Sequence, residues 1–500
     1  MIVKLHSASL IGIRALPVTV EVSTSPGWKW HIVGLADSAI RESYYRIRSA
    51  IRTGQKWPGF QFTVNLAPAD LRKVGSLYDL PIALGVLAAA RRISLLGLER
   101  YMIVGELSLD GSLRPVRGVL AMALLAKSLG YVGILVPKEN AEEAAVVEGL
   151  RVRYAEHFKE VLEALSGVRS WQVRPPSVFE PSEQRDCPDY ADIQGQKAVK
   201  RALVIAAAGG HNILMIGPPG SGKTMMARRF PGILPALSKT EALEAALVHS
   251  ISGKSGRIGL MRTRPFRHPH HSCTAASMAG GGVPPAPGEI SLAHCGVLFL
   301  DELPEFSRSV LELLRQPLED RKVTIARSRY SVDFPANFQL IASMNPSPSG
   351  SFEEASNPII QGRYLGKLSR PLLDRLDMHV EVKAVPWSDL NHHQTSWTTE
   401  EMKVQVERVM DLQSRRYCDL EVQRNAELKP DQLKTYAALN RASQTLLREA
   451  AHKWNFSARA YHKILRVART IADLEGQDNI GLTHLSEAIQ YRILDRVSGR

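Results

Sequence analysis

The sequence contains few cysteines and no long apolar run. Its 4 cysteines are scattered over 500 residues without a Cys-x-x-Cys pair, which argues against disulfides and against a simple zinc knuckle. No apolar run approaches the roughly 20 residues needed to span a bilayer. The first residues, Met1 to Leu5, lack the basic, apolar and small-residue order of a signal peptide. We therefore expect a cytoplasmic protein without membrane contact.

The whole chain carries a net charge of +13, and acidic residues are absent between Glu244 and Glu289. Cationic side chains on such a segment can follow a phosphate backbone without reading bases. A solvated basic loop is the alternative. A histidine cluster in this segment could also form a metal site with two cysteines and a later histidine, but the spacing is not a standard zinc pattern; the residues are His268, His270, His271, Cys273, His294 and Cys295. The basic and histidine side chains of the interval are Lys254, Arg257, Arg262, Arg264, Arg267, His268, His270 and His271.

A glycine-rich segment, Gly217 to Thr224, follows an apolar run that ends at Ile216. The order of strand, glycine loop and helix start is the one that a phosphate-binding loop requires. Lys223 is expected to reach the β- and γ-phosphates, and the Thr224 hydroxyl to bind Mg²⁺. The segment therefore predicts binding of a nucleoside triphosphate. The expected nucleotide contacts are Gly217, Pro218, Pro219, Gly220, Ser221, Gly222, Lys223, Thr224 and Met225.

Two further apolar runs end in polar residues, which favours strands whose carboxyl ends meet at the phosphate loop. The run from Gly296 is followed by Asp301 and Glu302. Asp301 would hold the Mg²⁺ shell, and Glu302 would polarise the attacking water. The run from Gln339 is followed by Asn345, which could orient the water or sense the γ-phosphate. A core strand with an acidic end and a plain Asn-Pro turn are the respective alternatives.

The N-terminal region reads as mixed strand and helix. Val18 to Val22 alternates like a half-buried strand, and the segment after Asp70 leads into an apolar helix with Pro81 near its first turn. Two strands are expected around the Asp110-Gly111 turn, and a helix over 120–129. Ile134 to Pro137 is expected to form a further strand, and Asn140 to cap the short helix after it.

Part of this region, Gly105 to Gly118 followed by Val136 to Asn140, resembles the proteolytic domain of Lon-type proteases. The resemblance implies their fold, which is like domain 2 of ribosomal protein S5. Lon enzymes use a Ser–Lys dyad, but the sequence around Ser76 lacks the nucleophile signature, and the family's lysine falls near Met122. An apolar side chain cannot activate a hydroxyl. We interpret the domain as catalytically inactive.

The later motifs resemble those of AAA+ ATPases. That resemblance implies ATP with Mg²⁺ as cofactors and places the backbone near Ile193 against the adenine. It also assigns Arg375, with Arg370 as the local competitor, to the arginine finger that reaches a neighbouring subunit. Arg459 fits the second sensor, which folds a lid onto the nucleotide; a surface arginine is the alternative.

The whole chain resembles the magnesium-chelatase-like AAA+ ATPases of the YifB/ComM family. The resemblance rests on segments such as Arg264 to His271, Pro287 to His294 and Ala468 to Asp473. It implies a hexameric ATP-driven helicase that binds single-stranded or branched DNA and promotes branch migration, with recombination proteins as partners during natural transformation. A chelatase-like metallochaperone ATPase is the alternative, and a Lon-like protease is the less favoured one.

The predicted fold class is α/β: a P-loop AAA+ core with an α+β Lon-protease-like domain before it and a helical lid after it. The predicted boundaries are 1–167 for the first domain, 168–188 for a proline-rich linker, 189–388 for the core and 389–500 for the lid. Relatives carry a four-cysteine cluster after Asn345. Here Ser347, Ser349, Glu354 and Ser356 stand at those places, so we expect no zinc there.

Overall fold

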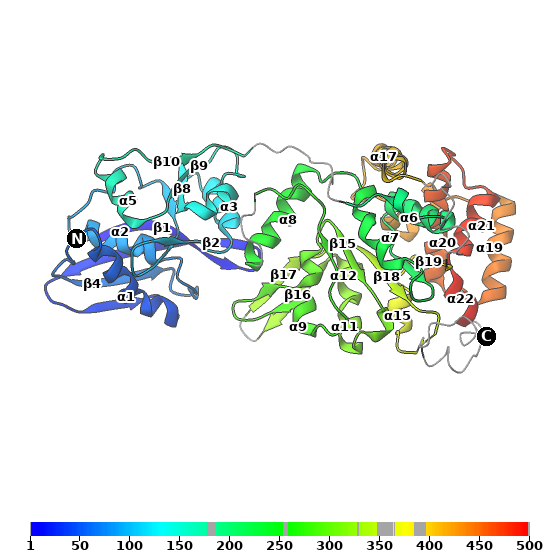
Figure 1. Ribbon diagram of the computed structural model, residues 1–500, viewed down its shortest axis with the longest axis horizontal. Coiled ribbons are helices and arrows are strands. Elements are labelled where there is room, and N and C mark those ends of the chain that lie inside the picture. Colours follow the sequence, from blue (N-terminus) through cyan, green and yellow to red (C-terminus); the bar gives the residue numbers. More distant parts are fainter. Residues whose placement is uncertain are drawn as a thin grey trace.

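The structure, a computed structural model, describes residues 2–177, 187–253, 259–327, 330–347, 364, 366–384 and 397–498. It has three parts in a row (Figure 1). An N-terminal mixed sheet with helices lies at one end, a parallel sheet with helices lies in the middle, and a group of helices lies at the other end. The middle part carries the glycine-rich loop between β11 (Ile213–Ile216) and α7 (Lys223–Arg229).

The N-terminal part is built on an eight-stranded sheet with the order β10-β9-β8-β5-β1-β2-β4-β3. In β2, Val18, Val20 and Val22 are buried on one face, as the alternation in the sequence predicts. The strands are β1 (Ile2–Ile11), β2 (Arg14–Ser25), β3 (Trp30–Val33), β4 (Gln61–Ala67), β5 (Tyr101–Ile103), β8 (Gly133–Pro137), β9 (Arg151–Ala155) and β10 (Gln172–Arg174). The helices are α1 (Ser38–Arg52), α2 (Asp79–Ala89), α3 (Val119–Ser128), α4 (Ala141–Ala144) and α5 (Phe158–Leu165).

The predicted elements of this part are present, with two differences. Helix α2 has Pro81 as its third residue, and β6 (Glu106–Leu107) pairs with β7 (Leu113–Arg114) around the Asp110-Gly111 turn. The Asn140 cap is wrong: the side chain instead exchanges two hydrogen bonds with the Val116 backbone, which leaves α4 without a side-chain cap. The linker starts later than predicted, because β10 pairs with β9 inside the predicted range 168–188.

The residues at the places of a Ser–Lys dyad have structural surroundings. Met122 is fully buried in α3. The Ser76 hydroxyl donates to the Glu106 carboxylate. The interpretation of the domain as catalytically inactive stays a prediction.

Helix α8 (Lys239–Ser252) joins the N-terminal part to the middle part. Its Ala246 belongs to the buried apolar cluster of the N-terminal sheet. The Ser250 hydroxyl donates to the buried carboxylate of Glu143, and the Ser250 carbonyl accepts from Gly118 N at 3.3 Å. Because apolar contacts and buried hydrogen bonds coincide here, the two parts form one packed interface along α8.

The middle part contains a five-stranded parallel sheet with the order β12-β15-β18-β11-β19. Its carboxyl edge, where the strands end, carries the phosphate loop, and its amino edge, where they begin, lies opposite. The strands are β11 (Ile213–Ile216), β12 (Phe266–Arg267), β15 (Val297–Leu300), β18 (Gln339–Met344) and β19 (Met378–Glu381). Two small hairpins, β13 (Gly280–Gly281) with β14 (Ala286–Pro287) and β16 (Lys322–Arg327) with β17 (Tyr330–Pro335), flank it.

The helices of the middle part cover both faces of this sheet (Figure 1). They are α6 (Lys197–Gly209), α7 (Lys223–Arg229), α8, α9 (Ala275–Ala279), α10 (Glu289–Leu292), α11 (Arg308–Leu313), α12 (Arg315–Asp320) and α15 (Arg370–Leu373). A parallel sheet covered on both faces is an α/β arrangement, as the sequence predicts for this part of the chain.

The C-terminal part consists of helices that share an apolar core with the sheet. Ile464, Ala468 and Ile471 of α20 are buried in the same cluster as α6 and β11. The helices are α17 (Thr399–Arg416), α18 (Pro430–Tyr436), α19 (Arg441–Trp454), α20 (Ala458–Leu474), α21 (Leu482–Gln490) and α22 (Ile493–Ser498). Over the described residues, no helix combines the length and hydropathy that crossing a membrane requires.

Candidate nucleotide site

The phosphate loop lies between β11 and α7. Gly220 and Gly222 have φ angles of +76° and +89°, in the left-handed region that favours glycine. Lys223 donates from Nζ to the carbonyls of Gly217 at 2.7 Å and Pro218 at 2.8 Å, so its side chain lies back along the loop. The Ser221 hydroxyl is buried without a hydrogen-bond partner. An open loop with an unsatisfied hydroxyl and a lysine along it fits an anionic phosphate chain.

Thr224 and Asp301 come together at the carboxyl edge. The Thr224 hydroxyl donates from Oγ1 to Asp301 Oδ2 at 2.6 Å. The other carboxylate oxygen of Asp301 accepts from the Ser343 hydroxyl on the neighbouring strand β18. Hydroxyl and carboxylate oxygens are ligands that Mg²⁺ prefers. The donor set therefore fits the Mg²⁺ that accompanies a bound triphosphate.

Glu302 follows Asp301 in a left-handed conformation with φ of +54°. Its backbone N–H donates to Asp301 Oδ1 at 3.1 Å and to Ser343 Oγ at 3.3 Å, and these bonds hold the unusual conformation. Such strained positions persist where the surroundings over-determine them, often at functional sites. The carboxylate is half-exposed and lies 3.7 Å from His271 Nδ1. Glu302 is thus held at the edge of the loop with its carboxylate directed to solvent, where a water could be polarised.

Asn345 lies directly after β18, next to the phosphate loop. Its Oδ1 accepts from Lys223 Nζ at 3.3 Å. Burial lowers the pKa of Lys223, and the charges of Asp301 and Glu302 oppose that shift. The structure therefore brings together Lys223, Thr224, Asp301 and Asn345, with Glu302 adjacent, as the sequence predicts.

The backbone groups of Ile193, which the resemblance places against an adenine, are bonded within the chain. Its backbone N–H donates to Tyr190 O at 3.0 Å, and its carbonyl accepts from Lys200 Nζ at 2.7 Å. Both polar backbone groups are thus bonded inside the chain, and the side chain is buried in the apolar core. Met225, at the start of α7, is 50% exposed and accessible to a ligand.

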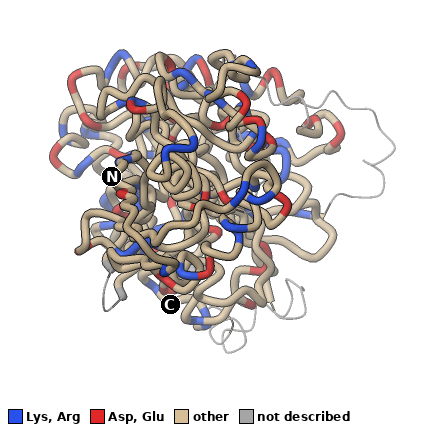
Figure 2. The backbone as a smooth tube through the Cα atoms, turned by 90° about the vertical axis from the view of Figure 1, so that its left-hand side faces the viewer, with Lys and Arg blue, Asp and Glu red and all other residues tan. Residues whose placement is uncertain are grey.

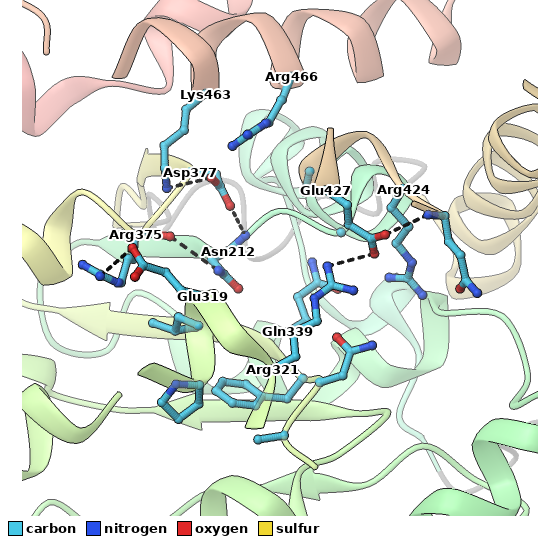
Figure 3. A pocket seen from close by; sticks show the side chains of 18 of the residues that line it. Asn212, Glu319, Arg321, Gln339, Arg375, Asp377, Arg424, Glu427, Lys463 and Arg466 are labelled. Carbon is cyan, nitrogen blue, oxygen red and sulfur yellow. Dashed lines mark hydrogen bonds and ion pairs between the residues drawn. The ribbon is translucent and has the colours of Figure 1, made fainter. Parts of the chain in front are cut away.

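Arg375 and Arg459 do not lie at the phosphate loop. Both line a pocket of about 360 Å³ at the amino edge, together with Asn212, Gln339 and Asp377 from the beginnings of three strands. Figure 3 shows this pocket with Arg375 beside Glu319, and with Asp377 between Lys463 and Asn212. The strands of four residues between the two edges hold them about 13 Å apart. Neither arginine is therefore placed to contact the nucleotide of its own chain.

Glu319, at the end of α12, holds both arginines. Its Oε1 lies 2.6 Å from Arg375 Nη2 and 3.9 Å from Arg459 Nη2. Arg375 also donates from Nη1 to Pro371 O at 2.6 Å, and its side chain is 13% exposed, compared with 60% for Arg459. Arg375 is thus the more firmly held of the two, and Arg459 is the more accessible.

The second-sensor role of Arg459 stays a prediction, and the structure places this residue away from the phosphate loop of its own chain. Lys463, one turn further along α20, pairs with Asp377 at 2.8 Å and fixes the start of the helix to the amino edge. The apolar face of α20 is buried against α6, so moving Arg459 to the phosphate loop would expose that face. Packing of the helix therefore decides its position.

His211, just before β11, is fully buried beside this ion pair. Its Nε2 is 2.8 Å from Thr470 Oγ1, and its Nδ1 has no partner. Burial lowers the pKa of His211 to about 4, an effect that Asp377 opposes and that Arg466 and Lys463 reinforce. The ring is therefore neutral in the folded protein at pH values where the unfolded chain is already protonated.

We expect the middle part to lose about 2 kcal/mol of stability from His211 alone between pH 7 and pH 5. Because the folded pKa is about 4 and the ordinary value 6.5, this contribution is complete above pH 6.5 and is lost as the pH falls towards 4. Hydrogen-exchange protection of β11, corrected for intrinsic rates, measures it. The His211→Gln variant should show a smaller loss; an equal loss in both proteins would contradict the assignment.

Two cations of the acid-free interval have acidic partners within the chain. Arg264 is buried, pairs with Glu241 at 3.1 Å and donates to the Cys295 carbonyl at 2.8 Å. Arg267 pairs with Glu289 at 2.5 Å. Burial and pairing leave Arg264 no exposed group for a phosphate, whereas Arg267 is 33% exposed and its contact with nucleic acid stays a prediction. Lys254 and Arg257 lie outside the described residues, as do Ser349, Glu354 and Ser356.

Potential metal ligands come together at a place other than the cluster of His268, His270 and His271. Among the described residues, ligand atoms of Glu244, His294 and Cys295 lie within 4.8 Å of one another. His294 Nδ1 accepts from Asn337 N at 3.0 Å, whereas a metal-bound histidine donates from its second ring nitrogen. Burial raises the pKa of the Cys295 thiol to about 12, which disfavours the thiolate that a metal needs. The donor set does not fit a metal.

Ser343 and Glu319 are site residues that the motifs miss. Ser343 is a polar residue inside the apolar run of β18, and this signal could have identified it. Glu319 has no signal in the sequence, because its partners come from α20 and from the segment after α15. The edge that a residue occupies is visible only after folding.

Comparison with known proteins gives similarity along nearly the whole chain. Residues 20–140, 189–390 and 396–492 match, respectively, the families described as subunit ChlI of Mg-chelatase, magnesium chelatase subunit ChlI, and its C-terminal region. The chain is 42% identical over 498 residues to the uncharacterized protein YifB of Salmonella typhimurium, across 98% of this chain and 97% of that protein. It is 42% identical over 501 residues to the competence protein ComM of Haemophilus influenzae, with the same coverage of 98% and 97%.

A more distant similarity points in the same direction. The magnesium-chelatase 38 kDa subunit of Cereibacter sphaeroides is 26% identical over 215 residues, which are 39% of this chain and 58% of that protein. The long, full-length matches at 42% identity carry more weight than this partial one.

Proposed function

Because the chain belongs to the YifB/ComM family of magnesium-chelatase-like AAA+ ATPases, we propose that it is an ATP-hydrolysing ring motor that acts on DNA. The observation that carries the proposal is the division of the site between two edges of one sheet. The phosphate loop and the acids lie at the carboxyl edge, and the arginines lie at the amino edge. Two copies of the chain are needed to bring them together.

Five residues of one chain bind and cleave the triphosphate in this proposal. Lys223 pairs with the β- and γ-phosphates, and Glu302 polarises the attacking water. Asn345 orients that water or senses the γ-phosphate. Thr224 and Asp301 would hold Mg²⁺, which neutralises charge on the phosphates when it is bound.

Arg375 completes the site of a neighbouring copy in the proposed ring. On binding, the phosphates of the neighbour replace Glu319 as the partner of Arg375, and Arg459 approaches the same phosphates as a second cation. The pocket is lined by seven lysine and arginine side chains and five acids, so its net charge favours an added anion. A head-to-tail contact of this type closes into a ring, and six copies are the number that the family resemblance implies.

DNA is the proposed substrate for two reasons. The net charge of +13 favours a polyanionic partner. One full-length relative is named a competence protein, which agrees with helicase and branch-migration activity during recombination in natural transformation. The motor would act in the cytoplasm on single-stranded or branched DNA, with recombination proteins as partners.

The test is ATP hydrolysis by the purified chain without DNA and with single-stranded, forked or four-way DNA. We expect each DNA to stimulate turnover, and we expect the stimulation to fall as salt rises, because phosphate contacts release counterions. The descriptions of the matched families favour a second candidate, a chelatase-like metallochaperone ATPase. Stimulation by a protein partner but not by any of the DNAs would favour that candidate. Cleavage of unfolded casein would be the sign of a Lon-like protease.

A further inference from the structure

An aromatic cluster lies where α1 packs on the edge of the N-terminal sheet. Trp30 of the edge strand β3 lies 5.2 Å from Tyr44 of α1, 6.1 Å from Trp57 and 6.2 Å from Phe62 of β4, measured between ring centroids. Tyr44 and Trp57 meet edge to face at 5.8 Å. The four rings form one cluster, called the platform below, at the β3 edge of the sheet.

Three further aromatic side chains at this platform face solvent. Trp28 is 82% exposed, Tyr45 is 70% exposed and Phe60 is 45% exposed. Tyr45 lies 5.4 Å from Tyr44, and the Trp28 ring packs beside Gly59, next to Phe60. Large exposed aromatic side chains that gather in one place, instead of standing singly, mark a surface that binds a partner.

Cations accompany these rings. Arg41, Tyr45, Arg48 and Arg52 recur at intervals of three and four residues, so they form one stripe along α1. The Arg48 guanidinium lies 5.7 Å from the centre of the Tyr44 ring and donates to its hydroxyl at 3.0 Å. Lys29 and Lys56 are also exposed, and they directly precede two of the clustered rings, Trp30 and Trp57.

Acids offset little of this charge. Between Glu21 and Asp70 the sequence has 6 lysine and arginine side chains but only 2 acids, Asp37 and Glu42. One of the six, Arg46, pairs with Asp79 of α2 at 2.6 Å, and the Asp37 carboxylate caps α1, which leaves Glu42 as the exposed acid. Over this end of the molecule as a whole the two signs are interspersed (Figure 2). The excess of positive charge therefore coincides with the exposed rings.

We propose that this aromatic and basic face binds single-stranded nucleic acid. The arginine stripe pairs with the phosphate backbone, and bases stack on Trp28 and Tyr45, which is a sequence-tolerant mode because every base has a stacking face. The face deepens the proposed action on DNA, since it would keep a strand bound beside the motor. It lies outside the acid-free interval and outside the nucleotide site, so it is a separate contact.

The first test measures binding of a fluorescein-labelled oligo-dT of 30 nucleotides to the full chain by anisotropy, without ATP. The double variant Trp28→Ala/Tyr45→Ala should bind at least about tenfold more weakly, because each lost stacking contact corresponds to roughly a 5- to 150-fold change. The control variant Leu96→Ala/Leu109→Ala removes side chains that are 85% and 61% exposed elsewhere on the same domain, and should leave the affinity unchanged.

The second test separates charge from stacking. The variant Arg41→Ala/Arg52→Ala should reduce the slope of log affinity against log salt by about 1.4, since each phosphate contact on a single strand contributes about 0.7. Ultraviolet crosslinking to a bromodeoxyuridine oligonucleotide should attach the strand to the peptides that contain Trp28 and Tyr45. Crosslinks confined to other peptides would overturn the proposal.

Equal oligo-dT affinity of the aromatic variant and the wild type would also overturn it. If the aromatic variant lost self-association while its affinity for oligo-dT was kept, the face would be a protein interface. These measurements need no ATP turnover. A failure here is therefore distinguishable from a motor that is not stimulated by DNA.

Discussion

Replacing Glu302 with glutamine should reduce ATP turnover by about 10²- to 10⁴-fold while ATP still binds. The glutamine keeps the size of the side chain and the backbone bonds of Glu302 to Asp301 and Ser343, but it cannot accept a proton from water. Turnover is measured by phosphate release, and binding by the fluorescence of a labelled ATP analogue. The result tests whether the carboxylate next to the Mg²⁺ ligand is the general base.

Lys223→Ala is the matched control for this variant, since it removes the cation that lies along the phosphate loop. It should lose binding and turnover together, because the lysine contacts the phosphates in the ground state as well as during cleavage. A Glu302→Gln protein with unchanged turnover would move the base elsewhere, with His271 as the nearest titratable neighbour at 3.7 Å.

Replacing Arg375 with alanine should reduce turnover by about 10³- to 10⁵-fold, the range typical of an arginine finger. ATP binding should be kept, because Arg375 lies at the amino edge and every phosphate-loop residue is intact. The stability of the variant is checked by thermal melting, since Arg375 also bonds to Pro371 O and to Glu319 inside the chain.

Mixing two inactive variants distinguishes a shared site from a site within one chain. In a mixture of Arg375→Ala and Lys223→Ala chains, some Arg375→Ala protomers with intact phosphate loops sit beside neighbours that supply Arg375. Turnover should therefore reappear on mixing and should rise and then fall with the ratio of the two chains. A mixture that stays inactive at protein concentrations where rings form would mean that Arg375 serves only its own chain.

Glu319 holds the two arginines in the single chain, before any neighbour binds. Its carboxylate pairs with Arg375 and lies near Arg459, so both arginines already have an anion where a phosphate would bind. An arginine that exchanges one anion for another pays less desolvation than one taken from water. In the proposed ring, the ion pair would keep Arg375 in place for a neighbour.

The nucleotide site shows what local patterns determine. A glycine loop after an apolar strand, and acids after another, predicted the meeting of Lys223, Thr224 and Asp301 because parallel strands end at a common edge. Spacing along the chain sufficed, since each residue is fixed by its position relative to its own strand. The same reasoning placed Asn345 against Lys223.

The errors occurred where a side chain finds its partner far away in the sequence. Asn140 bonds to Val116 instead of capping α4, and Arg264 is buried and paired with Glu241. Charge counted along an interval does not reveal such partners. Exposure of a cation is decided by packing.

The sequence by itself determined the chemistry of this protein: a triphosphate loop, two acids and an asparagine at the ends of strands, and two arginines later in the chain. Only the tertiary structure decided that the arginines lie at the edge of the sheet opposite the loop. Arg375 lies there because it comes three residues before β19, and Arg459 because α20 buries its apolar face against α6 while the Lys463–Asp377 ion pair fixes the start of that helix at the amino edge. Neither constraint can be read from the residues that carry the chemistry.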